Sequence, residues 1–234
     1  KFSNIYIKYL CSFIITLGIA LLLSLQPDIG QTLLVFFSWS VLIFTSGVSI
    51  FLLFFLFSSI ILIFFYLIFF VSKFTYIKNR LISFIDSETG TYNFQSDRAL
   101  ESITSGGFFG KGIGEGTLKN RVPEAHTDYI ISVISEEFGV IAIILIFLLF
   151  LVFIYSVFKK VNFENDETIK LILVGSVSLI LMQTIIHIGV NIRLFPTTGM
   201  TLPFISYGGS SIISISILSG IILNFTKRNL NQNE

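Results

Sequence analysis

Charge is what this sequence has least of. Only 12% of its 234 residues are Asp, Glu, Lys or Arg, and 53% are hydrophobic, including 27 phenylalanines. A soluble domain carries about 25% charged residues. The low charge therefore excludes an ordinary soluble domain and indicates a protein that crosses a membrane several times. The net charge of +1 also gives no electrostatic basis for binding nucleic acid.

Cysteine and histidine are scarce as well. The single cysteine, Cys11, excludes an internal disulfide and is expected to pack as a small hydrophobic side chain. Glu124, His126 and Asp128 are spaced two residues apart. One histidine and two acids are weak evidence for a metal centre. We therefore assign no metal ligand, and the sequence gives no sign of an organic cofactor.

The apolar residues are gathered into runs that can cross a bilayer, which takes about 20 residues of helix. Residues 29–72 contain no charge. As one helix they would rise about 65 Å, twice the hydrocarbon thickness, so a turn at residues 46–49 must divide them. The sequence thus predicts an all-α integral membrane protein with six spans. They are residues 9–27, two helices within 29–72, and residues 129–158, 171–192 and 203–225.

Two polar loops separate these spans. Residues 73–127 form a long loop between the segments 1–72 and 128–234, which carry three spans each, and residues 193–202 form a short loop. A short amphipathic helix is expected near residues 97–104. The positive-inside rule predicts that both chain ends are cytoplasmic and that both loops are extracytoplasmic. The basic residues that set this orientation are Lys1, Lys8, Lys159, Lys160, Lys170, Lys227 and Arg228.

Six glycines between residues 106 and 116 are the most unusual feature of the long loop. They can bring backbone N–H groups close to an oxyanion such as a phosphate, with Lys111, Lys119 and Arg121 supplying positive charge. No Gly-Lys-Ser/Thr follows, so the pattern is not a Walker A loop. A flexible outer loop without a ligand is an equally supported alternative.

Asp128 stands where the fourth span begins. The positive end of the helix dipole would stabilise its carboxylate as an anion. The plainer and compatible alternative is a helix cap, in which Thr127 or Asp128 accepts a hydrogen bond from a free N–H group. Glu136 and Glu137 lie about 12 Å further along the same helix. These two acids either pair with a buried partner or take part in chemistry.

A polar stripe marks the fifth span. Gln183, His187 and Asn191 recur every four residues, so they share one face of the helix. Such a stripe favours hydrogen bonds that hold helices together over contact with a substrate. Arg193 follows at the outer end of the span, where it could bind a phosphate.

Taken together, these segments resemble the SEDS family, the shape, elongation, division and sporulation proteins of bacteria. The segment 123–128, Pro-Glu-Ala-His-Thr-Asp, is more similar to the division branch than to the elongation branch, as is Gly-Glu-Gly-Thr at 114–117. The sequence has His187, Thr198 and Ser135 where the family commonly has Asn, Lys, and Gly or Ala. The matching segments are residues 26–28, 30–32, 95–100, 106–107, 110–112, 114–117, 123–128, 136–139, 196–199, 202–203 and 206–211.

The resemblance implies a peptidoglycan glycosyltransferase that polymerises lipid II through β-1,4 bonds for septal wall synthesis. It implies ten spans, so four would precede Lys1. The key acid of the His-Thr-Asp segment corresponds to Asp128. The candidate substrate contacts are Lys111, Lys119, Arg121, Glu124, His126, Arg193, Ser206 and Ser210.

The resemblance also implies a setting. The protein would work in the bacterial cytoplasmic (inner) membrane at the division septum, with an FtsI-like class B penicillin-binding protein and other divisome proteins. A divalent cation such as Mg²⁺ or Mn²⁺ could help to neutralise the leaving pyrophosphate. Two alternatives stay open: a lipid II flippase, for which Glu136, Glu137 and His187 would line a polar path, and a non-catalytic scaffold of the division machinery.

Overall fold

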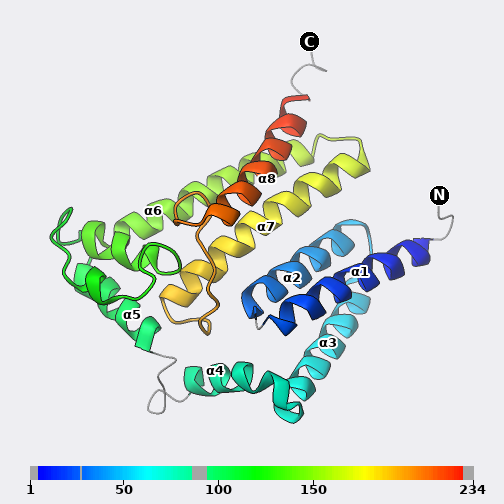
Figure 1. Cartoon of the computed structure of the whole chain (residues 1–234). Helices are drawn as coiled ribbons and strands as arrows, with labels where there is room; N and C mark the ends of the chain where they lie inside the picture. The colour runs from blue at the N-terminus through cyan, green and yellow to red at the C-terminus, as the bar shows by residue number, and fades with distance from the viewer. Residues whose placement is uncertain (1–4, 27, 86–93, 229–234) are drawn as a thin grey trace. The chain divides into compact units, whose positions relative to one another are not determined.

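The computed structural model describes residues 5–26, 28–85 and 94–228, and among these it contains helices and no strand (Figure 1). Contacts between residues divide the chain into two compact units, residues 1–79 and 80–234. Each unit has its own helical packing.

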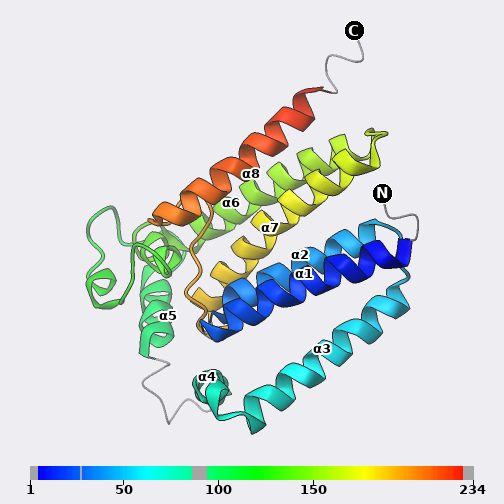
Figure 2. The ribbon, with the colours of Figure 1, turned by 45° about the vertical axis from the view of Figure 1, so that its right-hand side comes forward.

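The first unit contains three apolar helices. Helices α1 (Ile5–Leu25) and α2 (Ile29–Thr45) pack side by side (Figure 2), and α3 (Ile50–Phe70) follows the turn at residues 46–49. The predicted turn is therefore confirmed. Most aromatic side chains of α3 are exposed, as expected for residues that face lipid.

The break between α1 and α2 is also where the sequence predicts it. Asp28 accepts a hydrogen bond of 3.0 Å from the Gln31 N–H group and caps α2. Pro27, which belongs to the predicted break, lies outside the described residues.

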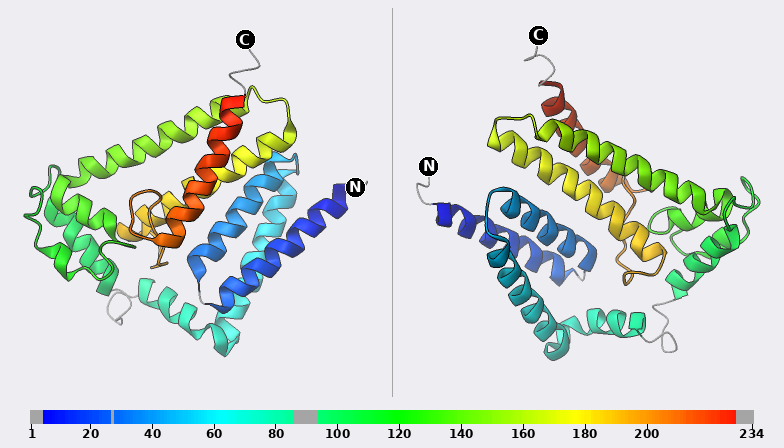
Figure 3. Two further views of the ribbon diagram at one scale, coloured as in Figure 1. Left: turned by 45° about the horizontal axis from the view of Figure 1, so that its top comes forward. Right: turned by 180° about the vertical axis from the view of Figure 1, so that it is seen from behind.

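The second unit contains the three remaining apolar helices. Helix α7 (Glu167–Asn191) packs against both α6 (Ile130–Val161) and α8 (Gly209–Arg228), and it is the most deeply buried of the three (Figure 3). The connection between α6 and α7 contains Asp166, which caps α7 by accepting a hydrogen bond from the Thr168 N–H group. This connection follows the C-terminal end of α6, whereas Asp128 precedes the N-terminal end of the same helix.

All six predicted apolar helices are present. Five are long and apolar enough to cross a membrane, and the sixth, α2, is shorter at 17 residues. A 17-residue helix rises about 26 Å, a little less than the hydrocarbon thickness of about 30 Å. The chain is a multi-pass membrane protein with five full-length candidate spans and one shorter apolar helix.

The long loop is more ordered than the sequence predicts. Helix α5 (Phe94–Gly106) contains the expected amphipathic piece and extends it at both ends. The short helices η1 (Ser72–Phe74), α4 (Thr75–Ile85) and η2 (Leu118–Arg121) were not predicted. The glycines argue against a regular helix over residues 106–116, and residues 107–117, named the glycine-rich loop below, contain none, while Gly106 ends α5.

Candidate active site

Helix α6 is interrupted in its N-terminal third. Gly139 has φ 81° and ψ 174°, which breaks the regular hydrogen bonding of the helix. In an unbroken helix the carbonyls of Glu136 and Glu137 would accept hydrogen bonds from the N–H groups of Val140 and Ile141. The break leaves these four backbone groups in need of other partners.

The glycine-rich loop supplies a partner to each of the four groups. Two loop N–H groups donate to α6, and two loop carbonyls accept from it. The bonds run from Lys111 N to Glu136 O (2.9 Å), Gly112 N to Glu137 O (3.0 Å), Val140 N to Gly107 O (3.0 Å) and Ile141 N to Phe108 O (3.4 Å). The loop is therefore docked into the break in α6.

Close packing explains why this loop needs glycine. A Cβ atom at Gly110 would overlap the backbone carbonyl of Glu137, and one at Gly139 would overlap the carbonyl of Phe108. A Cβ atom at Gly116 would lie 2.8 Å from the carboxyl carbon of Glu136. Backbone atoms cannot move aside as a flexible side chain can, so a larger residue would undock the loop.

The structure gives little support to the interpretation of these glycines as an oxyanion nest. Four of the six glycine N–H groups, those of Gly107, Gly110, Gly112 and Gly114, donate within the protein. Besides Lys111 and Gly112, the donors are Gly107 to Thr104 O (3.3 Å), Gly110 to Gly106 O (2.9 Å) and Gly114 to Glu137 Oε1 (3.3 Å).

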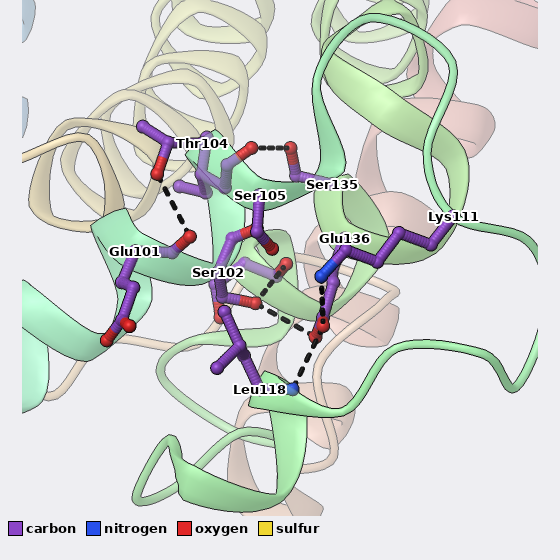
Figure 4. A network of polar contacts seen from close by, with 10 residues as sticks. Glu101, Ser102, Thr104, Ser105, Lys111, Leu118, Ser135 and Glu136 are labelled. Atoms are coloured by element: carbon purple, nitrogen blue, oxygen red, sulfur yellow. Dashed lines mark hydrogen bonds and ion pairs between the residues drawn. The ribbon is translucent and has the colours of Figure 1, made fainter.

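Glu136 fixes the other side of the loop. Its side chain is fully buried and accepts hydrogen bonds from the Leu118 N–H group (2.9 Å) and the Ser102 hydroxyl (3.2 Å), while Lys111 Nζ lies 3.5 Å away (Figure 4). A buried carboxylate with several donors is a structural pairing. Of the two roles left open for Glu136, the structure favours this one, and it places Lys111 beside Glu136.

Residues 126–128, named the clamped segment, are held by their backbone carbonyls. The Tyr207 N–H group donates to His126 O (2.9 Å), the Ser206 hydroxyl donates to Thr127 O (2.6 Å), and the Asn191 amide donates to Asp128 O (3.0 Å). Three donors from two different parts of the chain thus fix three consecutive carbonyls. These three bonds are made to the backbone and do not involve the side chains of the segment.

The capping interpretation of Asp128 and Thr127 is wrong. The residue that precedes α6 is Tyr129, and no side chain caps the helix. The N–H groups of Thr127, Asp128 and Tyr129 instead donate to the carbonyl of Glu124, at 3.1, 3.1 and 3.2 Å. Glu124 has a φ of 52°, a left-handed conformation that curls the chain around its own carbonyl.

The Asp128 carboxylate is therefore available for chemistry. Among the described residues, none donates a hydrogen bond to it. Gly199 lies close to the carboxylate: a Cβ atom added at Gly199 would be 3.5 Å from Asp128 Oδ2. Burial raises the pKa of the Asp128 carboxyl above its ordinary value, and the negative charge of Glu124 raises it further. This is the opposite of the stabilised anion expected from the helix dipole.

The polar stripe on α7 makes hydrogen bonds within the protein, as the sequence predicts. Two of its residues bind residues 192–208, the loop between α7 and α8, whereas the prediction was bonds between helices. His187 Nδ1 lies 2.7 Å from the Met200 carbonyl, and Gln183 Nε2 donates to the Thr201 carbonyl at 2.9 Å. Since a carbonyl only accepts, the His187 ring carries its proton on Nδ1. His187 and Thr198 are both buried, so these two departures from the family pattern lie inside the protein.

Two arginines approach the site from other elements. Arg193 Nη1 lies 2.6 Å from Asp97 Oδ1, which joins the 192–208 loop to α5. Arg80 Nη1 donates to the Thr197 carbonyl at 2.7 Å. Burial and the Asp128 charge raise the pKa of Tyr129, and the Arg80 charge opposes them. Arg80 is thus a cation near Tyr129 that sequence reasoning missed.

Comparisons with known proteins show the family of the chain. The model of the family described as "Cell cycle protein" (FTSW_RODA_SPOVE) matches residues 2–231. The chain belongs to the FtsW/RodA/SpoVE family. A protein of Caulobacter vibrioides named "Probable peptidoglycan glycosyltransferase FtsW" is 36% identical over 225 residues, which cover 96% of this chain and 56% of the relative. A protein of Enterococcus hirae with the same name is 37% identical over 150 residues, covering 64% of this chain and 37% of the relative.

A solved structure shares the fold. It is described as "Structural coordination of polymerization and crosslinking by a peptidoglycan synthase complex". The TM-score is 0.78 at 26% identity, over 94% of this chain and 62% of the other. The chain therefore spans about three fifths of the length of the Caulobacter relative and of the solved chain.

The remaining predicted site residues of this FtsW/RodA/SpoVE-family chain lie in different environments. Ser206 is buried, with its hydroxyl donating to Thr127 O and accepting from the Leu202 N–H group at 2.8 Å, which makes it part of the scaffold. Ser210 lies in the first turn of α8 and is exposed. The Lys119 side chain lies outside the described atoms. Three of the predicted substrate contacts are exposed and precede Asp128: Arg121, Glu124 and His126.

No three side chains of His, Cys, Asp or Glu within the described part of the chain gather into a group that could hold a metal ion. This family member does provide one half-buried carboxylate, Asp128, which has no hydrogen-bond donor among the described residues and lies on a backbone fixed by three hydrogen bonds. Such an arrangement can accept a proton from a hydroxyl group.

Proposed function

We propose that this protein is a peptidoglycan glycosyltransferase that polymerises lipid II into glycan strands. The observation that carries the proposal is Asp128. Its backbone carbonyl is clamped by Asn191, and its carboxylate has no hydrogen-bond donor among the described residues. A general base is most effective when its pKa lies near the working pH, and burial moves the pKa of Asp128 upward, toward that range.

The reaction would be a single displacement. The acceptor sugar hydroxyl loses its proton to the Asp128 carboxylate, and its oxygen forms a bond to the anomeric carbon of the donor sugar. The bond from that carbon to the polyprenyl pyrophosphate breaks, and the pyrophosphate leaves with the electron pair. The configuration at the anomeric carbon inverts.

The leaving pyrophosphate needs positive charge. Arg121 is exposed near the carboxylate in sequence, and Arg193 and Arg80 are held on the surrounding elements. Lys111 lies beside Glu136 and would have to act from there. A divalent cation such as Mg²⁺ would draw most of its ligands from the phosphates and water, as is usual for Mg²⁺.

The setting is also part of the proposal. The relatives named for FtsW and the solved synthase complex support a protein of the bacterial inner membrane at the division septum, with both chain ends cytoplasmic. A crosslinking class B penicillin-binding protein of the FtsI type and other divisome proteins would be its partners, and the growing glycan strand its product.

The rival function, flipping of lipid II, has less support. It depends on Glu136, Glu137 and His187 forming a polar path. Glu136 is occupied by Ser102 and Leu118, Glu137 accepts from Gly114, and His187 binds the Met200 carbonyl. No described observation favours the path over these internal bonds.

The variant Asp128→Asn tests the proposal. It keeps the volume of the side chain and the backbone clamp, and it removes the base. We expect polymerisation of fluorescent lipid II by the purified whole protein to fall about 10²–10⁴-fold, with normal insertion and partner binding.

Asp166→Asn is the matched control. Asp166 also precedes a helix, caps it through Thr168, and lies at the opposite end of α6 and α7, so its variant should polymerise at the wild-type rate. Polymerisation by Asp128→Asn near the wild-type rate would remove the base from the mechanism. Loss of lipid II flipping in Asp128→Asn vesicles, with polymerisation intact, would support the rival.

A further inference from the structure

Helix α6 is too long for its whole length to lie in hydrocarbon. Its 32 residues rise about 48 Å, against a hydrocarbon thickness of about 30 Å. The charge-free part runs from residue 138 to residue 158, between Glu137 and Lys159. That is about 21 residues or about 31 Å, which matches the hydrocarbon. The boundary on the Asp128 side therefore lies near Phe138.

The glycine-rich loop is fixed at this level. Its Gly107 and Phe108 carbonyls accept hydrogen bonds from Val140 and Ile141, which belong to the first turn inside the apolar part of α6. The backbone of Phe108 thus lies beside residues that enter the hydrocarbon. The docking of the loop determines its depth, because these are backbone bonds to the spanning helix.

The loop presents large apolar side chains at this depth. Phe108 is 74% exposed, Phe109 84% and Ile113 78%. On the adjoining part of α6, Phe138 and Ile141 are each 46% exposed. The exposed apolar surface therefore continues from the spanning helix onto a loop that is otherwise polar.

We propose that Phe108, Phe109 and Ile113 form a membrane anchor that inserts into the leaflet on the Asp128 side. The occupant of this surface is lipid, because the Phe108 backbone is bonded to the first turn of the apolar part of α6, and Phe109 and Ile113 extend the exposed apolar surface along the same loop. Lys111, between Phe109 and Ile113, keeps 36% of its side chain exposed. A lysine at this height can reach lipid phosphates while its stem lies along apolar surface.

The anchor gives the docked loop a second point of attachment. Glu136 and the break in α6 hold the loop to the protein, and the apolar tip holds it to the bilayer. This proposal depends on the membrane spans and on the loop geometry, and it holds whether or not Asp128 is the base.

Tryptophan fluorescence in lipid tests the anchor. Residues 1–234 contain a single tryptophan, Trp39, so the background protein carries Trp39→Phe and has any tryptophan outside these residues replaced by Phe. Phe109→Trp and, separately, Ile113→Trp then place one fluorophore on the proposed anchor. Arg121→Trp places one on an exposed residue of the same polar region and serves as the matched control.

The three variants are compared in vesicles of phosphatidylcholine brominated near the glycerol end of the acyl chains. We expect bromolipid to quench the fluorescence of the Phe109→Trp and Ile113→Trp variants at least about twice as strongly as that of the control, because only their tryptophans enter the interface. Equal quenching of all three would overturn the proposal. Protection of the anchor variants from bromolipid, with a blue shift only when a protein partner is added, would overturn it in favour of a protein-docking surface.

Discussion

The glycine-rich loop and the clamped segment follow each other in the chain and use their atoms in opposite ways. In the loop, backbone N–H groups and the Lys111 side chain are both engaged with α6. In the clamped segment, the backbone carbonyls are engaged by other parts of the chain. The loop therefore uses its backbone and Lys111 to bind α6, whereas the clamped segment is held by its backbone and leaves the Asp128 carboxylate without a donor among the described residues.

Two carboxylates show the same contrast. Glu136 is fully buried and accepts from Ser102 and Leu118, so its charge is compensated by fixed donors. Asp128 has no such donor among the described residues and a raised pKa. An acid near a helix start is thus a candidate base when its partners are missing, and a structural element when they are present.

The largest effect should come from disrupting the docking of the glycine-rich loop on α6. Gly110→Ala places a methyl group against the Glu137 backbone at a φ of 77°. We expect the loop to undock and the free energy of unfolding to fall by about 3 kcal/mol, with polymerisation lost. Thermal unfolding of the purified protein in detergent, followed by fluorescence, measures the change.

Gly107→Ala is its matched control. Gly107 lies in the same loop, also has a positive φ, 59°, and has open space where its Cβ would be. Only the backbone strain remains, which costs about 1 kcal/mol. Equal melting temperatures for the two variants would show that the loop is not docked on α6 as described.

A smaller effect should come from loosening the clamped segment. Ser206→Ala removes the donor to Thr127 O and the acceptor of the Leu202 N–H group. We expect kcat to fall about 10- to 100-fold because Asp128 is then less well positioned. KM should hardly change, since the Ser206 hydroxyl faces the protein interior.

This prediction separates two roles for Ser206, scaffold and substrate contact. A rise in KM at constant kcat would restore the substrate contact expected from the sequence. Ser219→Ala is the control, because the Ser219 hydroxyl donates to Ile215 O within its own helix. Lipid II titrations with the three proteins give both constants.

The smallest effect should come from the charge of Glu124. It is the second cause, after burial, of the raised pKa of Asp128. Activity needs ionised Asp128, so it should fall as the pH drops through the raised pKa. Glu124→Gln should lower that pKa and move the acid limb of the pH–rate profile to lower pH, whereas Glu115→Gln should leave it in place. A shift to higher pH would contradict this electrostatic account.

The same pKa fixes the sign of the effect on stability. The pKa of Asp128 is higher in the folded protein than its ordinary value of 3.8. The folded state therefore binds the proton more tightly than the unfolded chain does. The contribution of Asp128 to stability is fully present below that ordinary value and is lost as the pH rises through the raised pKa.

The sequence predicts the helices well because long apolar runs have one solution in a bilayer. It also predicts that the α7 stripe makes hydrogen bonds within the protein, although it expects other helices as partners and the structure shows carbonyls of the 192–208 loop. The break at Gly139 could not be predicted, because a single glycine within an apolar run does not reveal that a loop docks there. The clamp on residues 126–128 is equally hidden, because its donors Ser206 and Asn191 are remote in sequence and bind carbonyls, which every residue has.

The protruding outer end of α6 has a consequence for the choice of lipid. From Phe138 to the start of the helix at Ile130 is about 12 Å of rise, so the helix itself sets the distance of Asp128 from the acyl chains. Longer acyl chains would bury residues 130–138 of α6. Shorter acyl chains would make the bilayer thinner, and α6 would tilt to relieve the hydrophobic mismatch. The reach of the carboxylate toward a lipid-linked sugar is then a property of the bilayer as much as of the protein. The rate of polymerisation should therefore change gradually with the length of the acyl chains.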